Sequence, residues 1–122
     1  MVLKKIKSDT SDTETVQYLK NHDFDPNGLD AVGHSPFTMA AFVGKLKTLK
    51  YLKIQRANIN HIQKKTKDTA LSSAIYSAVH DTYDFKVVKY LLSIGLLLEG
   101  ARSARPEETE MYDEWKKHNG TS

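Results

Sequence analysis

Five histidines are the side chains of this 122-residue chain best suited to acid–base catalysis or metal binding near neutral pH. They are His22, His34, His61, His80 and His118. No two of them stand four residues apart, the spacing that places two ligands on one helix face, and none belongs to an HExxH zinc pattern. His80 and Asp81 could form a proton relay, but an exposed loop is the better interpretation of that polar stretch. We therefore expect no metal site.

The nucleophilic side chains form no catalytic pattern either. The chain has no cysteine, which excludes disulfides and thiolate metal sites. It also lacks the G-x-S-x-G, Walker and dinucleotide-binding glycine patterns. Ser35 and Thr69 stand where a hydroxyl would cap the first turn of a helix, which explains both without chemistry. We expect a protein that is not an enzyme and that binds no cofactor.

The charged residues are strongly segregated, although the net charge is only +3. Residues 31–67 contain eight basic residues and no acidic one, and they lie between an acidic front and an acidic tail. Six of these bases form a candidate basic patch for an acidic protein or nucleic acid: Lys47, Lys50, Lys53, Lys64, Lys65 and Lys67. A solvated helix face is the favoured competing interpretation. Nucleic acid is disfavoured because the usual interleaving of aromatic side chains and the usual preference for arginine over lysine are missing.

These side chains must be positioned by helices, and the signals for two short helices are clear in the middle of the chain. Ser35 is placed to cap a helix over residues 36–43, and Gly44 ends that helix. A second helix follows over residues 46–55, with three leucines on one face. It ends at Arg56, where we expect a non-glycine residue in the left-handed conformation.

The helix pair recurs along the chain at a nearly constant period. Leu52 follows Leu19 by 33 positions, and Ala74 follows Ala40 by 34. The opening SPFTMA, which starts at Ser35, returns as TALSSA, which starts at Thr69. In these features the chain resembles the ankyrin repeat, whose period is about 33 residues and whose repeats open with T-P-L-H-x-A.

The resemblance implies an all-α fold, a short solenoid of helix–turn–helix units with hairpin finger loops. We expect a flexible leader at residues 1–12, a repeat array at 13–105 and a C-terminal capping helix at 106–119. The capping helix begins at Pro106 and should cover the open end of the array.

Within the array, the resemblance implies a capping half-repeat at residues 13–32 and full repeats at 33–66 and 67–99. The last repeat is longer than the others because five extra residues separate its helices, which we expect at 70–79 and 85–94. We expect this insertion, residues 80–84, to be a loop. Neutral drift is favoured over a specific contact as its explanation.

Ankyrin-like arrays mostly bind other proteins through their fingers and inner helices, so the resemblance implies non-catalytic protein–protein binding. Phe42 and Tyr76 hold equivalent positions in neighbouring repeats and should stack in a column beside the concave surface, where aromatic side chains commonly anchor an interface. Burial of both rings between the repeats is an equally good interpretation. The partner-binding residues that we predict are Leu29, Asp30, His34, Phe42, Gln63, Lys65 and Tyr76.

The hydropathy pattern favours a soluble protein. No apolar run approaches the roughly 18 residues needed to span a bilayer, and the N-terminus lacks the apolar core of a signal peptide. Together with the absence of cysteine, these features favour a cytoplasmic location. Small ankyrin-like proteins also occur as bacterial or viral products that act on host proteins, so delivery into a host cell stays open. The sequence leaves the partner and the oligomeric state open as well.

Overall fold

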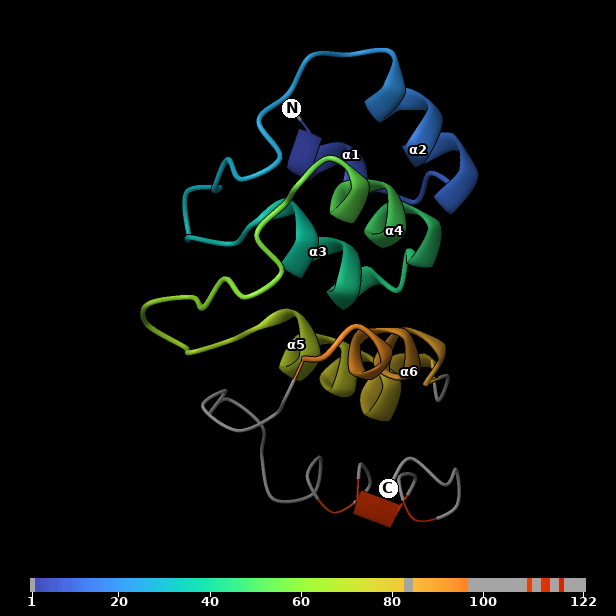
Figure 1. Ribbon diagram of the computed structural model, residues 1–122, viewed down its shortest axis with the longest axis vertical. Coiled ribbons are helices and arrows are strands. Elements are labelled where there is room, and N and C mark those ends of the chain that lie inside the picture. The colour runs from blue at the N-terminus through green and yellow to red at the C-terminus, as the bar shows by residue number, and fades with distance from the viewer. Residues whose placement is uncertain (1, 83–84, 97–109, 111–112, 115–116, 118–122) are drawn as a thin grey trace.

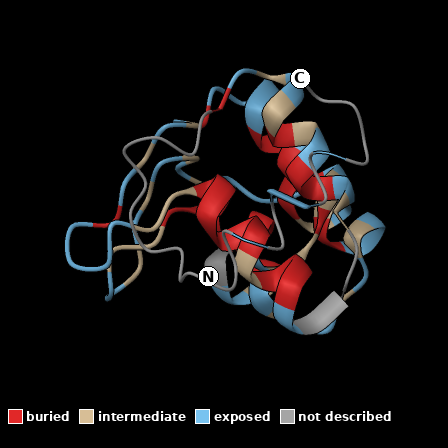
Figure 2. Cartoon of the chain, turned by 90° about the horizontal axis from the view of Figure 1, so that it is seen from below, coloured by how far each residue is buried: buried red, intermediate tan, exposed pale blue. Residues whose placement is uncertain are grey.

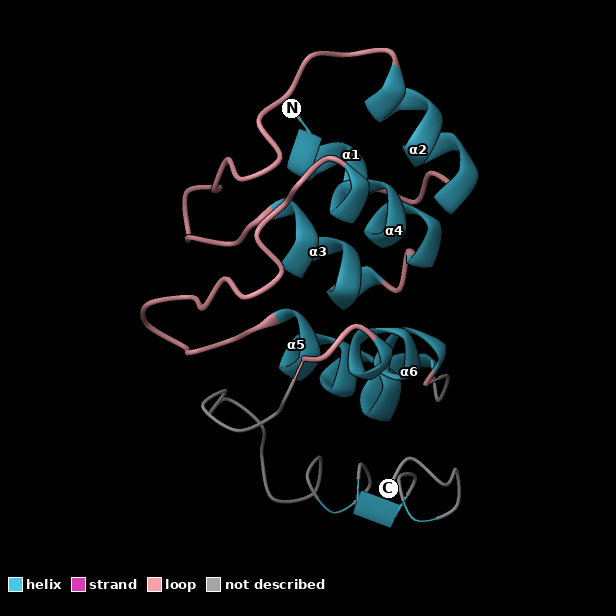
Figure 3. Ribbon diagram, viewed as in Figure 1, coloured by secondary structure: helices cyan, strands magenta, loops and turns pink. Residues whose placement is uncertain are grey.

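The chain folds into a short stack of helices in the computed structural model, which describes residues 2–82, 85–96, 110, 113, 114 and 117 (Figure 1). The elements are α1 (Val2–Lys7), α2 (Asp12–Lys20), α3 (Pro36–Val43), α4 (Leu46–Ile54), α5 (Ala70–Ser77), the π-helical turn η1 (Ala78–Thr82) and α6 (Lys86–Ser93). No strand occurs in this described part of the chain (Figure 3). The prediction of an all-α solenoid is confirmed.

Three helix pairs form the stack: α1 with α2, α3 with α4, and α5 with α6 (Figure 1). The inner helix α3 packs between α1 and α5, and the outer helix α4 packs against α2 and α6. Two loops project from one side of the stack. We call them finger 1 (residues 29–34) and finger 2 (residues 61–68). This arrangement places the inner helices beside the fingers and the outer helices away from them.

The predicted helix ends are confirmed at α3 and α5. The Ser35 hydroxyl accepts a hydrogen bond from Thr38 N at 3.2 Å, and Gly44 ends α3 in the left-handed conformation at φ 77°. At α5, Thr69 and Ser72 form a reciprocal capping box, in which each side chain bonds to the backbone of the other residue. Side chains and glycine therefore satisfy the helix ends locally.

The buried residues of the helices, red in Figure 2, form one core cluster that includes small and branched residues at matching positions. Ile6, Ala40 and Ala74 form a column along the inner helices, and each is at most 2% exposed. The buried leucines of the outer helices are Leu19, Leu52 and Leu91. Because alanine is small, α3 can approach both of its inner neighbours closely.

The N-terminal segment is helical, so the prediction of a flexible leader at residues 1–12 is wrong for Val2–Lys7. Ile6 is completely buried where α1 packs on α3. A helix of this length is unstable alone because nucleation is costly, so packing on the stack must hold it in place. The prediction of a half-repeat at residues 13–32 is corrected at the same time, since α1 supplies the inner helix that the half-repeat lacks.

A buried lysine fastens the end of α1. The Lys45 ammonium donates hydrogen bonds to the backbone oxygens of Lys5 and Ser8, at 3.4 and 3.1 Å, and to Thr15 Oγ1 at 2.9 Å. Burial lowers the pKa of Lys45 below its ordinary value of 10.5, and the charge of Asp12 acts in the opposite direction. This basic residue therefore belongs to the interior and not to the solvated basic block.

The N-terminus of α4 is capped from the neighbouring pair. The Asp12 carboxylate accepts hydrogen bonds from Lys47 N at 2.7 Å, from Thr48 N at 2.9 Å and from Thr48 Oγ1 at 2.7 Å. The residue in the N-cap position of α4 itself, Lys45, makes no side-chain capping bond. One repeat thus completes the outer helix of the next.

Two non-glycine residues adopt the left-handed conformation. Arg56 follows α4 at φ 66°, as the sequence predicted. After the outer helix α6, the same conformation is taken by a glycine, Gly95, at φ 96°. In finger 2, Lys67 has φ 64° at the position that matches Gly33, whose φ is 88°. Arg56 and Lys67 each bear the strain of a conformation that favours glycine.

The prediction of a loop at residues 80–84 is wrong for its first part. The chain continues from α5 directly into η1, and a π-helical turn accommodates extra residues without leaving the helix. Residues 83–84 lie outside the described residues. So does most of the capping helix predicted at 106–119, of which Glu110, Asp113, Glu114 and Lys117 are described and helical.

Candidate functional site

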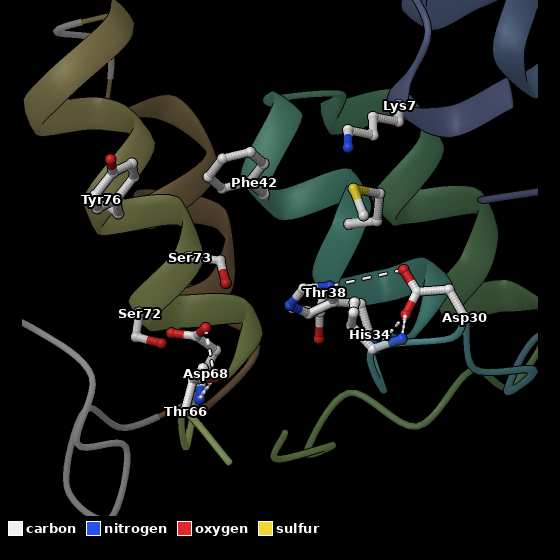
Figure 4. Close-up of a pocket in the computed structure, with 12 residues that line it drawn as sticks. Lys7, Asp30, His34, Thr38, Phe42, Thr66, Asp68, Ser72, Ser73 and Tyr76 are labelled. Atoms are coloured by element: carbon white, nitrogen blue, oxygen red, sulfur yellow. Dashed lines mark hydrogen bonds and ion pairs between the residues drawn. The ribbon is translucent and has the colours of Figure 1, made fainter. Parts of the chain in front are cut away.

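A groove with a volume of about 480 Å³ lies where α3, α5 and the two fingers meet (Figure 4). α3 forms one wall with Thr38, Met39 and Phe42, and α5 forms the other with Ser73 and Tyr76 among its residues. The fingers close one end, and α1 borders the opposite end. The groove is therefore assembled from elements of all three helix pairs.

The end of the groove away from the fingers is aromatic. The rings of Phe42 and Tyr76 stack with their centroids 5.9 Å apart and their planes 26° apart. The predicted column is confirmed, and the His80 ring continues it 4.5 Å beyond Tyr76. Phe42 keeps 37% of its surface exposed, and Tyr76 is half-buried, so neither ring is fully enclosed between the repeats. The stacked rings therefore leave apolar surface exposed on the walls of the groove.

Finger 1 is held by its own aspartate. Asp30 Oδ1 accepts hydrogen bonds from Val32 N at 3.0 Å and His34 N at 2.9 Å, and Oδ2 lies 3.7 Å from His34 Nδ1. Burial alone would raise the pKa of Asp30, but the hydrogen bonds from the backbone of His34 and Val32 hold it below its ordinary value of 3.8. Asp30 is therefore an ionised carboxylate that shapes the rim of the groove.

Finger 2 is fastened to finger 1 by two side chains. Gln63 Nε2 donates a hydrogen bond to the Val32 oxygen, and His61 Nε2 donates one to the Gly33 oxygen at 2.8 Å. Gln63 Oε1 also accepts bonds from Lys65 N and Thr66 N at 2.6 and 2.7 Å. With 6% of its surface exposed, Gln63 braces the fingers. Its amide is therefore engaged within the fingers, and its predicted role as a contact residue stays a prediction.

The structure brings four of the seven predicted partner-binding residues to the groove. They are Asp30, His34, Phe42 and Tyr76. Leu29 and Lys65 are exposed on the fingers but do not line the groove, and Gln63 is buried. The periodic pattern located the helix positions, whereas the direction of finger side chains depends on local turn geometry.

A family model of ankyrin repeats, in three copies, matches residues 6–100. The chain belongs to the ankyrin-repeat family. Because the match begins inside α1, the α1–α2 pair is the first of the three repeats. Ankyrin repeats are generally protein–protein interaction modules and are typically non-catalytic. No curated protein matches this chain.

Several groove residues of this ankyrin array were missed by reasoning from the sequence. Lys7 belongs to the segment that was expected to be flexible, and Met39 and Ser73 occupy matching positions on α3 and α5, one period apart. The period that located Phe42 and Tyr76 could have found Met39 and Ser73, which lie one turn earlier. It could also have placed α1, because Ile6 precedes Ala40 by the same interval that separates Ala40 from Ala74.

The six lysines of the candidate basic patch come from two separate elements of the ankyrin array. Lys47, Lys50 and Lys53 are exposed on α4, and the other three are exposed on finger 2, which projects away from that helix (Figure 1). Lys50 lies over the ring of Tyr90, 5.5 Å from its centroid, and Lys47 donates to Thr13 Oγ1 at 2.9 Å. The predicted patch is therefore divided.

The part of the chain that the structure describes contains no group of three or more His, Cys, Asp or Glu side chains that could hold a metal ion. Within the same part, no helix is both long and apolar enough to cross a bilayer. The groove contains acids, a histidine and hydroxyls, and its two carboxylates are engaged in local hydrogen bonds. Asp30 is bonded to its own backbone neighbours, and the Asp68 carboxylate accepts a hydrogen bond from Thr66 Oγ1 at 2.6 Å.

Proposed function

We propose that this ankyrin array is a non-catalytic binding module that holds a segment of a partner protein in the groove. The observation that carries the proposal is the stacked pair of Phe42 and Tyr76 on the groove walls. Phe42 remains 37% exposed beside residues that are fully buried. Exposed aromatic side chains in a concave and partly apolar site are common anchors of a partner.

The dimensions of the groove indicate a modest interface. A volume of about 480 Å³ accommodates only a few side chains of a partner. The three inner helices and two fingers also offer a short surface, at the small end of the range for specific complexes. We expect a dissociation constant on the order of micromolar when this surface acts alone.

The proposal is tested by capturing proteins from a lysate with the native chain and with a Phe42→Ala/Tyr76→Ala variant. We expect a specific partner to bind the native chain about tenfold or more tightly than the variant, because both anchor rings are lost. Circular dichroism should show the same helical content in both proteins, since Phe42 is exposed and Tyr76 is half-buried.

The matched control is Ile54→Ala, which removes an apolar side chain that is 74% exposed on the outer helix α4. This variant should retain the partner. Equal loss of the partner from both variants, or retention by the groove variant, would contradict the proposed site. Unfolding of the groove variant would show instead that the two rings support the core.

Binding of an acidic protein or nucleic acid through the lysines is a weaker candidate. The lysines of α4 and those of finger 2 form two small positive surfaces, whereas the sequence predicted a single patch. Repeating the capture at low and high salt separates the two functions, because counterion release makes polyanion binding fall steeply with salt. A partner lost only at high salt, and equally from the native chain and the groove variant, would favour the lysines.

A further inference from the structure

We propose that the groove selects an extended peptide segment with an acidic side chain next to an apolar one. The apolar side chain contacts Phe42 and Met39, the carboxylate pairs with Lys7, and Ser73 donates a hydrogen bond to the segment. The proposal rests on the proposed function and adds the chemistry of the partner. Two unused polar groups on the groove walls, one neutral and one charged, carry it.

The first is the Ser73 hydroxyl. Ser73 is 7% exposed and lines the groove, and its side chain points into the space between α5 and α3 (Figure 4). Among the described residues this hydroxyl has no hydrogen-bond partner, although the neighbouring Ser72 hydroxyl bonds within the capping box. A buried hydroxyl without a partner is unfavourable, because it has lost its hydrogen bonds to water. A ligand atom that accepts a hydrogen bond from it replaces one of those bonds.

The second is the Lys7 ammonium. Lys7 is exposed at the end of α1 and lines the groove at the aromatic end, on the side of Phe42 (Figure 4). Its ammonium has no ion-pair partner in the described part of the chain. Lys7 therefore supplies the positive charge at this end of the groove.

At its opposite end, the groove is lined by two carboxylates. Asp30 and Asp68 line it at the fingers, and both carboxylates already accept hydrogen bonds from neighbouring groups. They repel an acidic side chain at the finger end, whereas Lys7 attracts it at the α1 end. The charges therefore favour an acidic side chain at the α1 end of the groove over one at the finger end.

The charge preference is tested with a library of random dodecapeptides displayed on phage and selected against the full chain. Peptides enriched on the native protein should carry Asp or Glu beside an aliphatic or aromatic residue. The Lys7→Glu variant should enrich Lys or Arg at that place, because the sign of the wall charge is reversed. Lys4→Glu is the matched control, since Lys4 is exposed on α1 and does not line the groove, and it should keep the acidic preference.

The hydroxyl is tested with the most enriched peptide, labelled for fluorescence anisotropy. Ser73→Ala should weaken its binding by about three- to tenfold, the effect of one neutral hydrogen bond. Ser77→Ala removes a hydroxyl that is also buried on α5 but does not line the groove, and it should leave the affinity unchanged.

The outcomes separate this inference from the proposed function. Peptides that lose binding with Phe42→Ala/Tyr76→Ala but show no charge preference would overturn the inference and leave the binding groove standing. Peptides whose binding is indifferent to both aromatic substitutions would contradict the proposed function itself. A selection that enriches nothing would exclude an extended segment as the occupant.

Discussion

At the scale of single residues, backbone strain is the clearest feature that a substitution can relieve. Arg56 adopts φ 66° at the end of α4, a conformation that is costly for any residue with a Cβ. We expect Arg56→Gly to raise the free energy of unfolding by about 0.5–1 kcal/mol, with the flexibility of glycine in the unfolded chain offsetting part of the relief. Urea denaturation measures the change.

Gly44→Ala is the converse experiment. Gly44 has φ 77°, and a Cβ placed there would meet no atom within 4 Å, so a methyl group fits in space. Any loss of stability, which we expect to be about 1 kcal/mol, then reports the backbone conformation alone. If Gly44→Ala leaves the free energy of unfolding unchanged, this left-handed backbone bears little strain, and the same argument for Arg56 fails.

The sequence predicts some residues of the groove well and others poorly, for a physical reason. Phe42 and Tyr76 were located because the helical repeat places residues one period apart at equivalent positions. The burial of Gln63 was not predicted, because the turn of finger 2 directs its amide inward to backbone groups of both fingers. Periodicity carries information on helix faces, whereas finger side chains follow local hydrogen bonds.

At the scale of elements, finger 1 makes a pH-dependent contribution to stability. Hydrogen bonds to the ionised carboxylate lower the folded-state pKa of Asp30 below 3.8. Its contribution is therefore complete above that ordinary pKa and is lost as the pH falls through the lowered value. We expect Asp30→Asn to be about 1 kcal/mol less stable than the native chain at pH 7, since a neutral acceptor forms weaker bonds.

Thermal unfolding between pH 7 and pH 3 measures this contribution. The stability difference between the native chain and Asp30→Asn should narrow as the pH falls below about 4, because the Asp30 carboxylate takes up its proton first in the unfolded chain and only at a lower pH in the folded chain. Asp23→Asn provides the comparison, because Asp23 is exposed and makes no hydrogen bond in the described part of the chain. If the stability difference between the native chain and Asp30→Asn stays constant down to pH 3, the ionised carboxylate of Asp30 does not stabilise finger 1.

The helix α1 marks the limit of local sequence signals. Its residues, VLKKIK, span less than two turns and carry no cap pattern, so no local rule distinguishes them from a frayed end. Tertiary contacts stabilise this helix. Ile6 is buried in the core, and the Lys45 ammonium donates hydrogen bonds to the backbone oxygens of Lys5 and Ser8 at the end of α1. Comparison with the next repeats at the same period was the signal that could have found this helix.

At the scale of the whole molecule, the column of Ile6, Ala40 and Ala74 sets the distance between the repeats. A larger side chain at the centre must separate α3 from α1 or α5. We expect Ala40→Leu to cost about 1–3 kcal/mol through overpacking, with a lower urea midpoint and an unchanged m value. Ala31→Leu makes the same change on an exposed finger position and should have little effect.

The cap that Asp12 places on α4 gives the array a fixed order. One period later the same position holds Lys45, whose ammonium can neither accept an N–H bond nor favour the positive end of a helix. A gene duplication that copied the central unit behind itself would therefore create an outer helix without this support. An array lengthened in that way keeps the cap only if an aspartate replaces Lys45 in the unit that precedes each new outer helix. The contact between two neighbouring repeats, more than the single repeat, is therefore the unit that a longer array has to copy.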